Sequence, residues 1–216
     1  MIPRAVLGYL AGSHGRDCLP SRPSPLDSSL LDDGNTCWRR ILWNREDNEV
    51  PDERLKGVKS FHMLLLVRHA DAGDKLVWRG PDSLRPLSLA GRAEAAGLVV
   101  RLEDYPIRRM LTSPALRCHQ TLQPLARDCR LRIELDVRFG VDADLAPVLA
   151  LLEDLRSRDA VVCTHGEVIE QVLTRLVGDG LMVDQPLEWP KGSTWLLDGA
   201  NGRITHARYL PPLPWA

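Results

Sequence analysis

Four side chains in this sequence carry the groups that phosphoryl chemistry needs, and each comes shortly after an apolar segment. They are Arg68, His69, Arg117 and His165. Arginine presents a planar fork of donors that pairs with two phosphate oxygens at once. A neutral imidazole can attack phosphorus directly, which divides hydrolysis into two easier steps. Because phosphoryl transfer depends mainly on positioning and charge stabilisation, this set of side chains requires no metal ion or cofactor.

These side chains meet only if the segments before them are neighbouring strands of one sheet. Residues 63–67 and 160–163 are continuous apolar runs typical of buried parallel strands, and residues 110–112 form a shorter run. Helices are expected over residues 88–105, 114–129, 144–156 and 167–177, and further strands over 132–135, 194–197 and 203–209. Strands that alternate with helices indicate an α/β fold, here a three-layer α/β/α domain with a mostly parallel sheet. The ligand site of such a sheet lies beyond the carboxyl ends of its strands, where the four side chains stand.

The first part of the chain has a different composition from the rest. Residues 12–35 are dense in Ser, Pro, Gly and Asp, which interrupt helices and strands and bury little surface. We therefore expect residues 1–60 to be a disordered extension, with one short helix near residues 38–43, and residues 61–216 to form a single domain. Met63 directly precedes the first strand, so a natural start at Met63 is an alternative interpretation.

Composition excludes several classes of function. The formal net charge of the 216 residues is −1, which does not favour a nucleic-acid-binding or membrane-attracted surface. No apolar run approaches the roughly 18 residues that span a bilayer. The five cysteines are odd in number and irregularly spaced, which is typical of reduced thiols rather than of a disulfide framework or zinc site. A cytoplasmic protein is the expectation.

Five segments together resemble one known family. Three of them resemble the signature motifs of the histidine phosphatase (phosphoglycerate mutase-like) superfamily, and they occur in the same order along the chain as in that family. They are residues 65–70 (LLVRHA), 112–121 (TSPALRCHQT) and 161–166 (VVCTHG). Residues 85–92 (RPLSLAGR) are similar to a segment of its short phosphohistidine phosphatase-like (SixA-like) branch. Residues 191–195 (KGSTW) resemble the phosphatase domain that follows a Nudix domain in some actinobacterial enzymes. This chain itself contains no Nudix box.

The resemblance implies a role for each candidate residue. His69 would be the nucleophile that becomes phosphohistidine, Arg68 and Arg117 would bind the phosphoryl oxygens, and His165 would stabilise the transferring group. The general acid is where the sequence departs from the family, because Val141 stands where a Glu is common. The neighbouring Asp142 is our candidate for the acid.

The resemblance implies a metal-independent phosphohydrolase that acts on phosphomonoesters or phosphohistidine. The substrate would be a phosphorylated small molecule, nucleotide-related phosphates included, or a phosphoprotein. Two alternatives stay open, namely a phosphomutase and a degenerate domain that binds phosphorylated ligands without turnover. The short loop over residues 70–88 argues against a mutase, and it contains candidates for the substrate entrance in Lys75, Trp78, Arg79 and Arg85. The sequence does not predict an oligomeric state.

Overall fold

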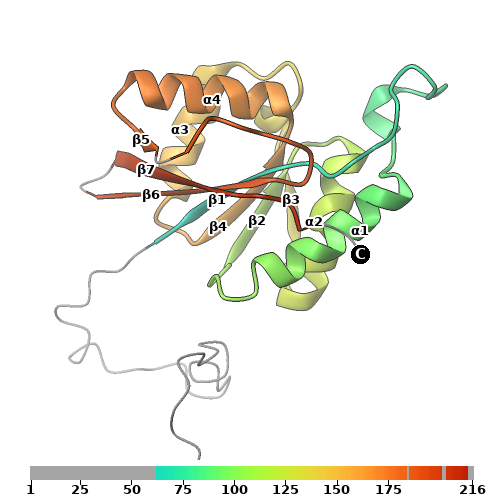
Figure 1. The fold of residues 1–216 in the computed structure, drawn as a ribbon, viewed down its shortest axis with the longest axis horizontal. Coiled ribbons are helices and arrows are strands. Elements are labelled where there is room, and N and C mark those ends of the chain that lie inside the picture. The colour runs from blue at the N-terminus through green and yellow to red at the C-terminus, as the bar shows by residue number, and fades with distance from the viewer. Residues whose placement is uncertain (1–61, 184, 201–202, 214–216) are drawn as a thin grey trace, which may run out of the picture. The chain divides into compact units, whose positions relative to one another are not determined.

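The computed structural model describes residues 62–183, 185–200 and 203–213 (Figure 1). The predicted extension over residues 1–60 and its short helix lie outside the described residues. Among the described residues, no helix has both the length and the apolar character needed to cross a membrane.

The strands of the described part of the chain form one sheet in the order β3-β2-β4-β1-β6-β7-β5. The bounds are β1 (Leu64–Arg68), β2 (Arg109–Thr112), β3 (Ile133–Leu135), β4 (Ala160–Thr164), β5 (Met182–Val183), β6 (Thr194–Ala200) and β7 (Arg203–Leu210). The pairs β2–β3, β2–β4, β1–β4 and β5–β7 are parallel, while β6 pairs antiparallel with β1 and β7. The predicted, mostly parallel sheet is confirmed.

Four helices cover the two faces of this sheet in the described residues (Figure 1). They are α1 (Leu89–Arg101), α2 (Leu116–Cys129), α3 (Leu145–Leu155) and α4 (Gly166–Gly178). Successive side chains of a strand point to opposite faces, so Leu64 and Leu66 of β1 pack with α3 and α4. Leu65 and Val67 pack with α1 and α2 on the other face. This alternation produces the predicted three-layer α/β/α arrangement.

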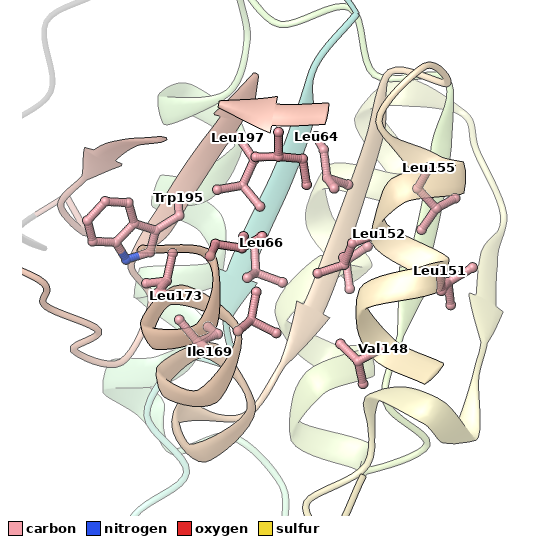
Figure 2. Close-up of a cluster of buried hydrophobic side chains, with 14 of the residues drawn as sticks. Leu64, Leu66, Val148, Leu151, Leu152, Leu155, Ile169, Leu173, Trp195 and Leu197 are labelled. Carbon is pink, nitrogen blue, oxygen red and sulfur yellow. The ribbon is translucent and has the colours of Figure 1, made fainter. Parts of the chain in front are cut away.

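The core between the sheet and the helices α3 and α4 is the larger of the two. Figure 2 shows Leu66 and Trp195 from the sheet facing Leu152 of α3 and Ile169 of α4. The indole nitrogen of Trp195 donates a hydrogen bond to the Glu188 carbonyl at 2.8 Å, so its burial leaves no polar atom without a partner.

Several predicted element boundaries are wrong by a few residues. Ser88 caps α1 as predicted and accepts a hydrogen bond from the Gly91 amide, but the helix ends at Arg101 rather than at residue 105. A residue that precedes proline disfavours helical backbone, so Pro106 prevents the helix from continuing through Tyr105. The helix predicted from residue 114 begins at Leu116, because Ala115 still has extended backbone. The short elements β5, η2 (Asp82–Leu84) and η3 (Val137–Phe139) were not predicted.

A pair of leucine substitutions tests the core. Leu152 in α3 is fully buried, whereas Leu89 at the start of α1 is 87% exposed. Leu152→Ala leaves a cavity, so we expect it to lower the free energy of unfolding by about 2–5 kcal/mol. The matched Leu89→Ala change should stay within about 0.5 kcal/mol of the parent protein. Urea unfolding measures both, and equal effects would show that α3 does not pack as described.

Candidate active site

The sheet places the carboxyl ends of three strands side by side, because β4 pairs with both β1 and β2. Backbone hydrogen bonds continue the pairing beyond the strands. The His69 amide donates to the Thr164 carbonyl at 3.0 Å, and the Ser113 amide donates to the Cys163 carbonyl at 3.0 Å. His165 is the N-cap of α4 and directly follows β4. The sheet register thus fixes the backbone that carries both histidines.

His69 is buried, with 6% of its surface exposed, and its ring is oriented by two hydrogen bonds. Nδ1 lies 2.8 Å from the Ala70 carbonyl, which can only accept, so Nδ1 carries the proton. Nε2 therefore has the lone pair, and it accepts a hydrogen bond from Arg117 Nε at 3.3 Å. Burial and the neighbouring charges lower the pKa of His69 from 6.5 to about 3, although the Ala70 bond raises it. At neutral pH this imidazole is an uncharged nucleophile.

His165 lies edge-on to His69, with ring centroids 5.3 Å apart and an interplanar angle of 68°. Its Nε2 lies 2.8 Å from the Ser113 hydroxyl, and its Nδ1 lies 3.4 Å from Arg117 Nη2. Because a guanidinium can only donate, Nδ1 is the acceptor in the second contact. The two imidazoles therefore contact each other and the same guanidinium.

Two guanidinium groups complete the site. Arg117, in the first turn of α2, is 3% exposed and donates from Nη1 to the Asp82 carbonyl at 2.7 Å. Its Nη2 forms an ion pair with Asp82 Oδ2 at 3.0 Å. Arg68, the last residue of β1, donates from Nη1 to the Trp189 carbonyl at 2.6 Å. The buried Nε of Arg68 has no hydrogen-bond partner among the described residues.

Gly166 allows Arg68 to lie against the start of α4. A Cβ built on Gly166 would come within 2.8 Å of the Arg68 Cζ and within 2.9 Å of its Nε. Real Cβ atoms do not approach other atoms so closely, so a larger residue here would displace the guanidinium. The position of the Arg68 guanidinium therefore requires a glycine at residue 166.

A second set of contacts holds the loop after His69. The Thr121 hydroxyl accepts from the Ala70 amide at 3.0 Å and donates to the Arg117 carbonyl at 2.7 Å, which ties this loop to α2. Lys191 Nζ forms an ion pair with Asp71 Oδ1 at 2.6 Å. Burial would raise the pKa of Asp71, but hydrogen bonds from Lys191 and Ser88 lower it to about 2. The carboxylate therefore stays charged and keeps the loop in place.

The structure brings Arg68, His69, Arg117 and His165 together at one edge of the sheet, where the sequence placed them. Asp142 is exposed between η3 and α3, and it forms no hydrogen bond or ion pair with any described residue. Its role as the general acid stays a prediction. Asp82 was missed, and the only sequence signal for it was an acidic residue shortly before Arg85 in the loop. No cluster of His, Cys, Asp and Glu suited to a metal ion occurs among the described residues.

The site can bind and polarise an anionic group. It offers a neutral nucleophilic nitrogen, two guanidiniums and a second imidazole, all within a buried edge of the sheet. Fixed donors aimed at developing charge are the main means of stabilising a phosphoryl transition state. The arrangement is suited to displacement at phosphorus by His69 Nε2.

Comparison with known proteins points to one family. The family model described as the histidine phosphatase superfamily (branch 1) matches residues 64–140. A curated relative from Mycolicibacterium smegmatis, named 8-oxo-(d)GTP phosphatase, is 30% identical over 186 residues, which cover 81% of this chain. The match covers 58% of that relative, so the chain spans less than two thirds of its length.

Solved structures agree in fold. A protein from Agrobacterium tumefaciens described as a phosphohistidine phosphatase, SixA, matches with a TM-score of 0.55 and 26% identity, over 70% of this chain and 98% of its own. A protein histidine phosphatase SixA solved with tungstate matches with a TM-score of 0.54 and 22% identity, over 68% of this chain and 94% of its own.

Substitution of Gly166 tests the placement of Arg68. We expect Gly166→Ala to displace the Arg68 guanidinium and to lower the affinity for inorganic phosphate or tungstate, because the added Cβ meets that side chain. Gly178→Ala is the matched control, since its Cβ would meet nothing within 4 Å. Isothermal titration calorimetry measures the two dissociation constants. Unchanged binding by Gly166→Ala would contradict the role of Arg68.

The lowered pKa of His69 predicts how stability depends on pH. Between pH 6.5 and about 3, His69 is protonated in the unfolded chain but neutral in the folded one. Unfolding then takes up a proton, so the free energy of unfolding falls as the pH falls through this range. We expect His69→Gln to lose less stability than the parent protein between neutral pH and a pH of about 5, measured by urea unfolding. Equal losses would show that His69 titrates normally.

Proposed function

Because this chain belongs to the histidine phosphatase superfamily and resembles its SixA-like members, we propose that it hydrolyses phosphomonoesters or phosphohistidine through a phosphorylated His69. The observation that carries this proposal is the orientation of the His69 ring. The bond from Nδ1–H to the Ala70 carbonyl leaves the Nε2 lone pair for phosphorus, beside Arg117 Nε at 3.3 Å.

The reaction would take place in two displacements. In the first, His69 Nε2 forms a bond to phosphorus while the bond from phosphorus to the leaving group breaks, and the leaving group takes up a proton from a general acid or from the solvent. In the second, a water oxygen attacks phosphorus and gives up a proton to the same acid or to the solvent, the bond between nitrogen and phosphorus breaks, and inorganic phosphate leaves. The nucleophile of each displacement, the imidazole or the water molecule, is neutral before it attacks, so neither has to lose a proton beforehand.

The remaining side chains would stabilise the charge of the phosphoryl oxygens. Arg117 contacts both imidazoles, so a phosphoryl group at His69 Nε2 would lie within reach of its donors. Arg68 Nε is buried and unpartnered among the described residues, and it would gain a partner in a phosphoryl oxygen. His165, which is 1% exposed and held by Ser113, lies beside His69 and would contact the same group.

The substrate would be a phosphorylated small molecule or a phosphoprotein. The SixA-like structures favour phosphohistidine by their names. The name of the mycobacterial relative favours a nucleotide-derived phosphate as the second candidate. A nucleotide phosphate and a phosphohistidine differ in the bond that breaks, so hydrolysis of each class by the full chain would separate the two.

Hydrolysis of p-nitrophenyl phosphate by the full chain tests the nucleophile. We expect measurable turnover by the parent protein, none by His69→Ala, and no change on addition of EDTA, because the proposed chemistry uses only His and Arg side chains. Strong inhibition by EDTA, or full activity of His69→Ala, would contradict the proposal. Binding of tungstate without turnover of any phosphate ester or phosphohistidine would favour a domain that only binds.

A second substitution tests the buried guanidinium. We expect Arg117→Ala to lower kcat by about 10²–10³-fold, the scale for loss of one preorganised donor to a developing oxyanion. Arg127→Ala is the matched control, because Arg127 lies in the same helix and is exposed. Similar rates for the two variants would remove Arg117 from the site.

A further inference from the structure

Asp82 occupies the donors of Arg117 that phosphate would need. It begins η2, in the loop between β1 and α1. Its carbonyl accepts from Arg117 Nη1 at 2.7 Å, and its Oδ2 lies 3.0 Å from Nη2. Its other carboxylate oxygen, Oδ1, accepts from Arg85 Nε at 2.9 Å. Burial would raise the pKa of Asp82, but the Arg85 hydrogen bond and the charge of Arg117 lower it below its usual range, so the group is an anion.

Every nitrogen of the Arg117 guanidinium already has a partner. Nε donates to His69, Nη1 donates to the Asp82 carbonyl, and Nη2 contacts both Asp82 Oδ2 and His165 Nδ1. A phosphate binds arginine by two parallel hydrogen bonds to anionic oxygens. The Asp82 carboxylate is itself an anion, and its Oδ2 already forms an ion pair with Nη2 at 3.0 Å. Attack by His69 Nε2 uses the lone pair that accepts from Arg117 Nε and so frees that donor. The second donor of a parallel pair, Nη2, stays occupied until Asp82 Oδ2 or His165 Nδ1 leaves.

Among these partners, Asp82 is the one that is free to leave. Its side chain is 33% exposed, whereas His69 and His165 are almost completely buried and fixed by the sheet. When its contact with Arg117 is lost, its carboxylate keeps the bond to Arg85. Arg85 is itself 8% exposed and held by the carbonyls of Ala72 and Gly73. Displacement therefore leaves no buried charge without a partner.

We propose that the Asp82 carboxylate is an internal competitor that occupies Arg117 in the resting site and is exchanged for the phosphoryl group of the substrate. Asp82 thereby sets the affinity of the site for phosphoryl anions. It selects for anions charged strongly enough to displace a carboxylate, and it returns to Arg117 as inorganic phosphate leaves. The inference rests on the proposed function, because it assigns Arg117 to the phosphoryl group.

The opposite role for Asp82 predicts the opposite sign. If the carboxylate only orients Arg117, its loss would disorder the guanidinium and weaken the binding of any oxyanion. If it competes, its loss would free a donor and strengthen that binding. The sign of the change in affinity therefore separates a competitor from a purely structural partner.

The test is the binding of tungstate and inorganic phosphate to the full chain by isothermal titration calorimetry. We expect Asp82→Asn to bind both oxyanions about fivefold more tightly than the parent protein, the scale of one partly exposed ion pair. Asp154→Asn is the matched control, because it removes the same charge and breaks another pair of Asp and Arg, the half-exposed pair with Arg158 at 2.9 Å. That pair lies shortly before β4 begins, whereas the candidate site follows the end of this strand. The control corrects for the change in net charge.

Weaker or unchanged binding by Asp82→Asn, relative to Asp154→Asn, would overturn the proposal. Circular dichroism checks that the variants are folded, and Asp82→Ala provides a second variant for the same measurement if Asp82→Asn does not fold. Hydrolysis of p-nitrophenyl phosphate is measured on the same samples. If Asp82→Asn binds oxyanions more tightly but the parent protein hydrolyses nothing, the exchange of Asp82 is supported and the proposed phosphatase function is rejected. If the parent protein hydrolyses the ester but Asp82→Asn does not bind more tightly, only the exchange of Asp82 is rejected.

Discussion

The permanent positive charge of Arg117, buried to 3% exposure, is the constraint on which the rest of the site depends. A buried charge is costly unless it is paired and hydrogen-bonded. Asp82 supplies the pairing, and both imidazoles accept hydrogen bonds from the guanidinium. Burial is the main cause of the lowered pKa of His69, and the charges of Arg117 and Arg68 lower it further. The buried edge of the sheet thus holds an uncharged imidazole beside two guanidiniums.

The sheet and its helices hold this charge in place. Hydrogen bonds from the backbone of His69 and Ser113 extend the pairing with β4 past the strand ends, so neither residue depends on a free loop. The hydroxyl of Thr121 connects the loop after His69 to α2. Close contact at Gly166 sets the distance between α4 and Arg68. Backbone bonds, the Thr121 hydroxyl and tight packing therefore hold His69, Ser113 and Arg68 in fixed positions, which is what preorganised electrostatic stabilisation requires.

Much of this arrangement follows from local sequence patterns. The apolar run in β1 and the equally apolar run in β4 predict adjacent buried strands, and adjacent parallel strands bring Arg68, His69 and His165 to one edge. Asp82 could not be predicted in this way, because its contact with Arg117 joins residues 35 positions apart through a loop of irregular backbone. The two-residue strand β5 is too short to leave a periodic pattern. Asp142 is a candidate only because it follows Val141, and a position next to another residue in the sequence fixes no side-chain direction.

The central claim is that His69 carries the phosphoryl group during turnover. The most direct measurement is rapid quenching of the full chain with a radiolabelled phosphomonoester under alkaline conditions, followed by identification of the labelled peptide. The account predicts label on the peptide that contains His69, stable to alkali and lost in acid, and absent from His69→Ala. Turnover by the parent protein with no labelled protein at any quench time, or label on a different residue, would contradict it.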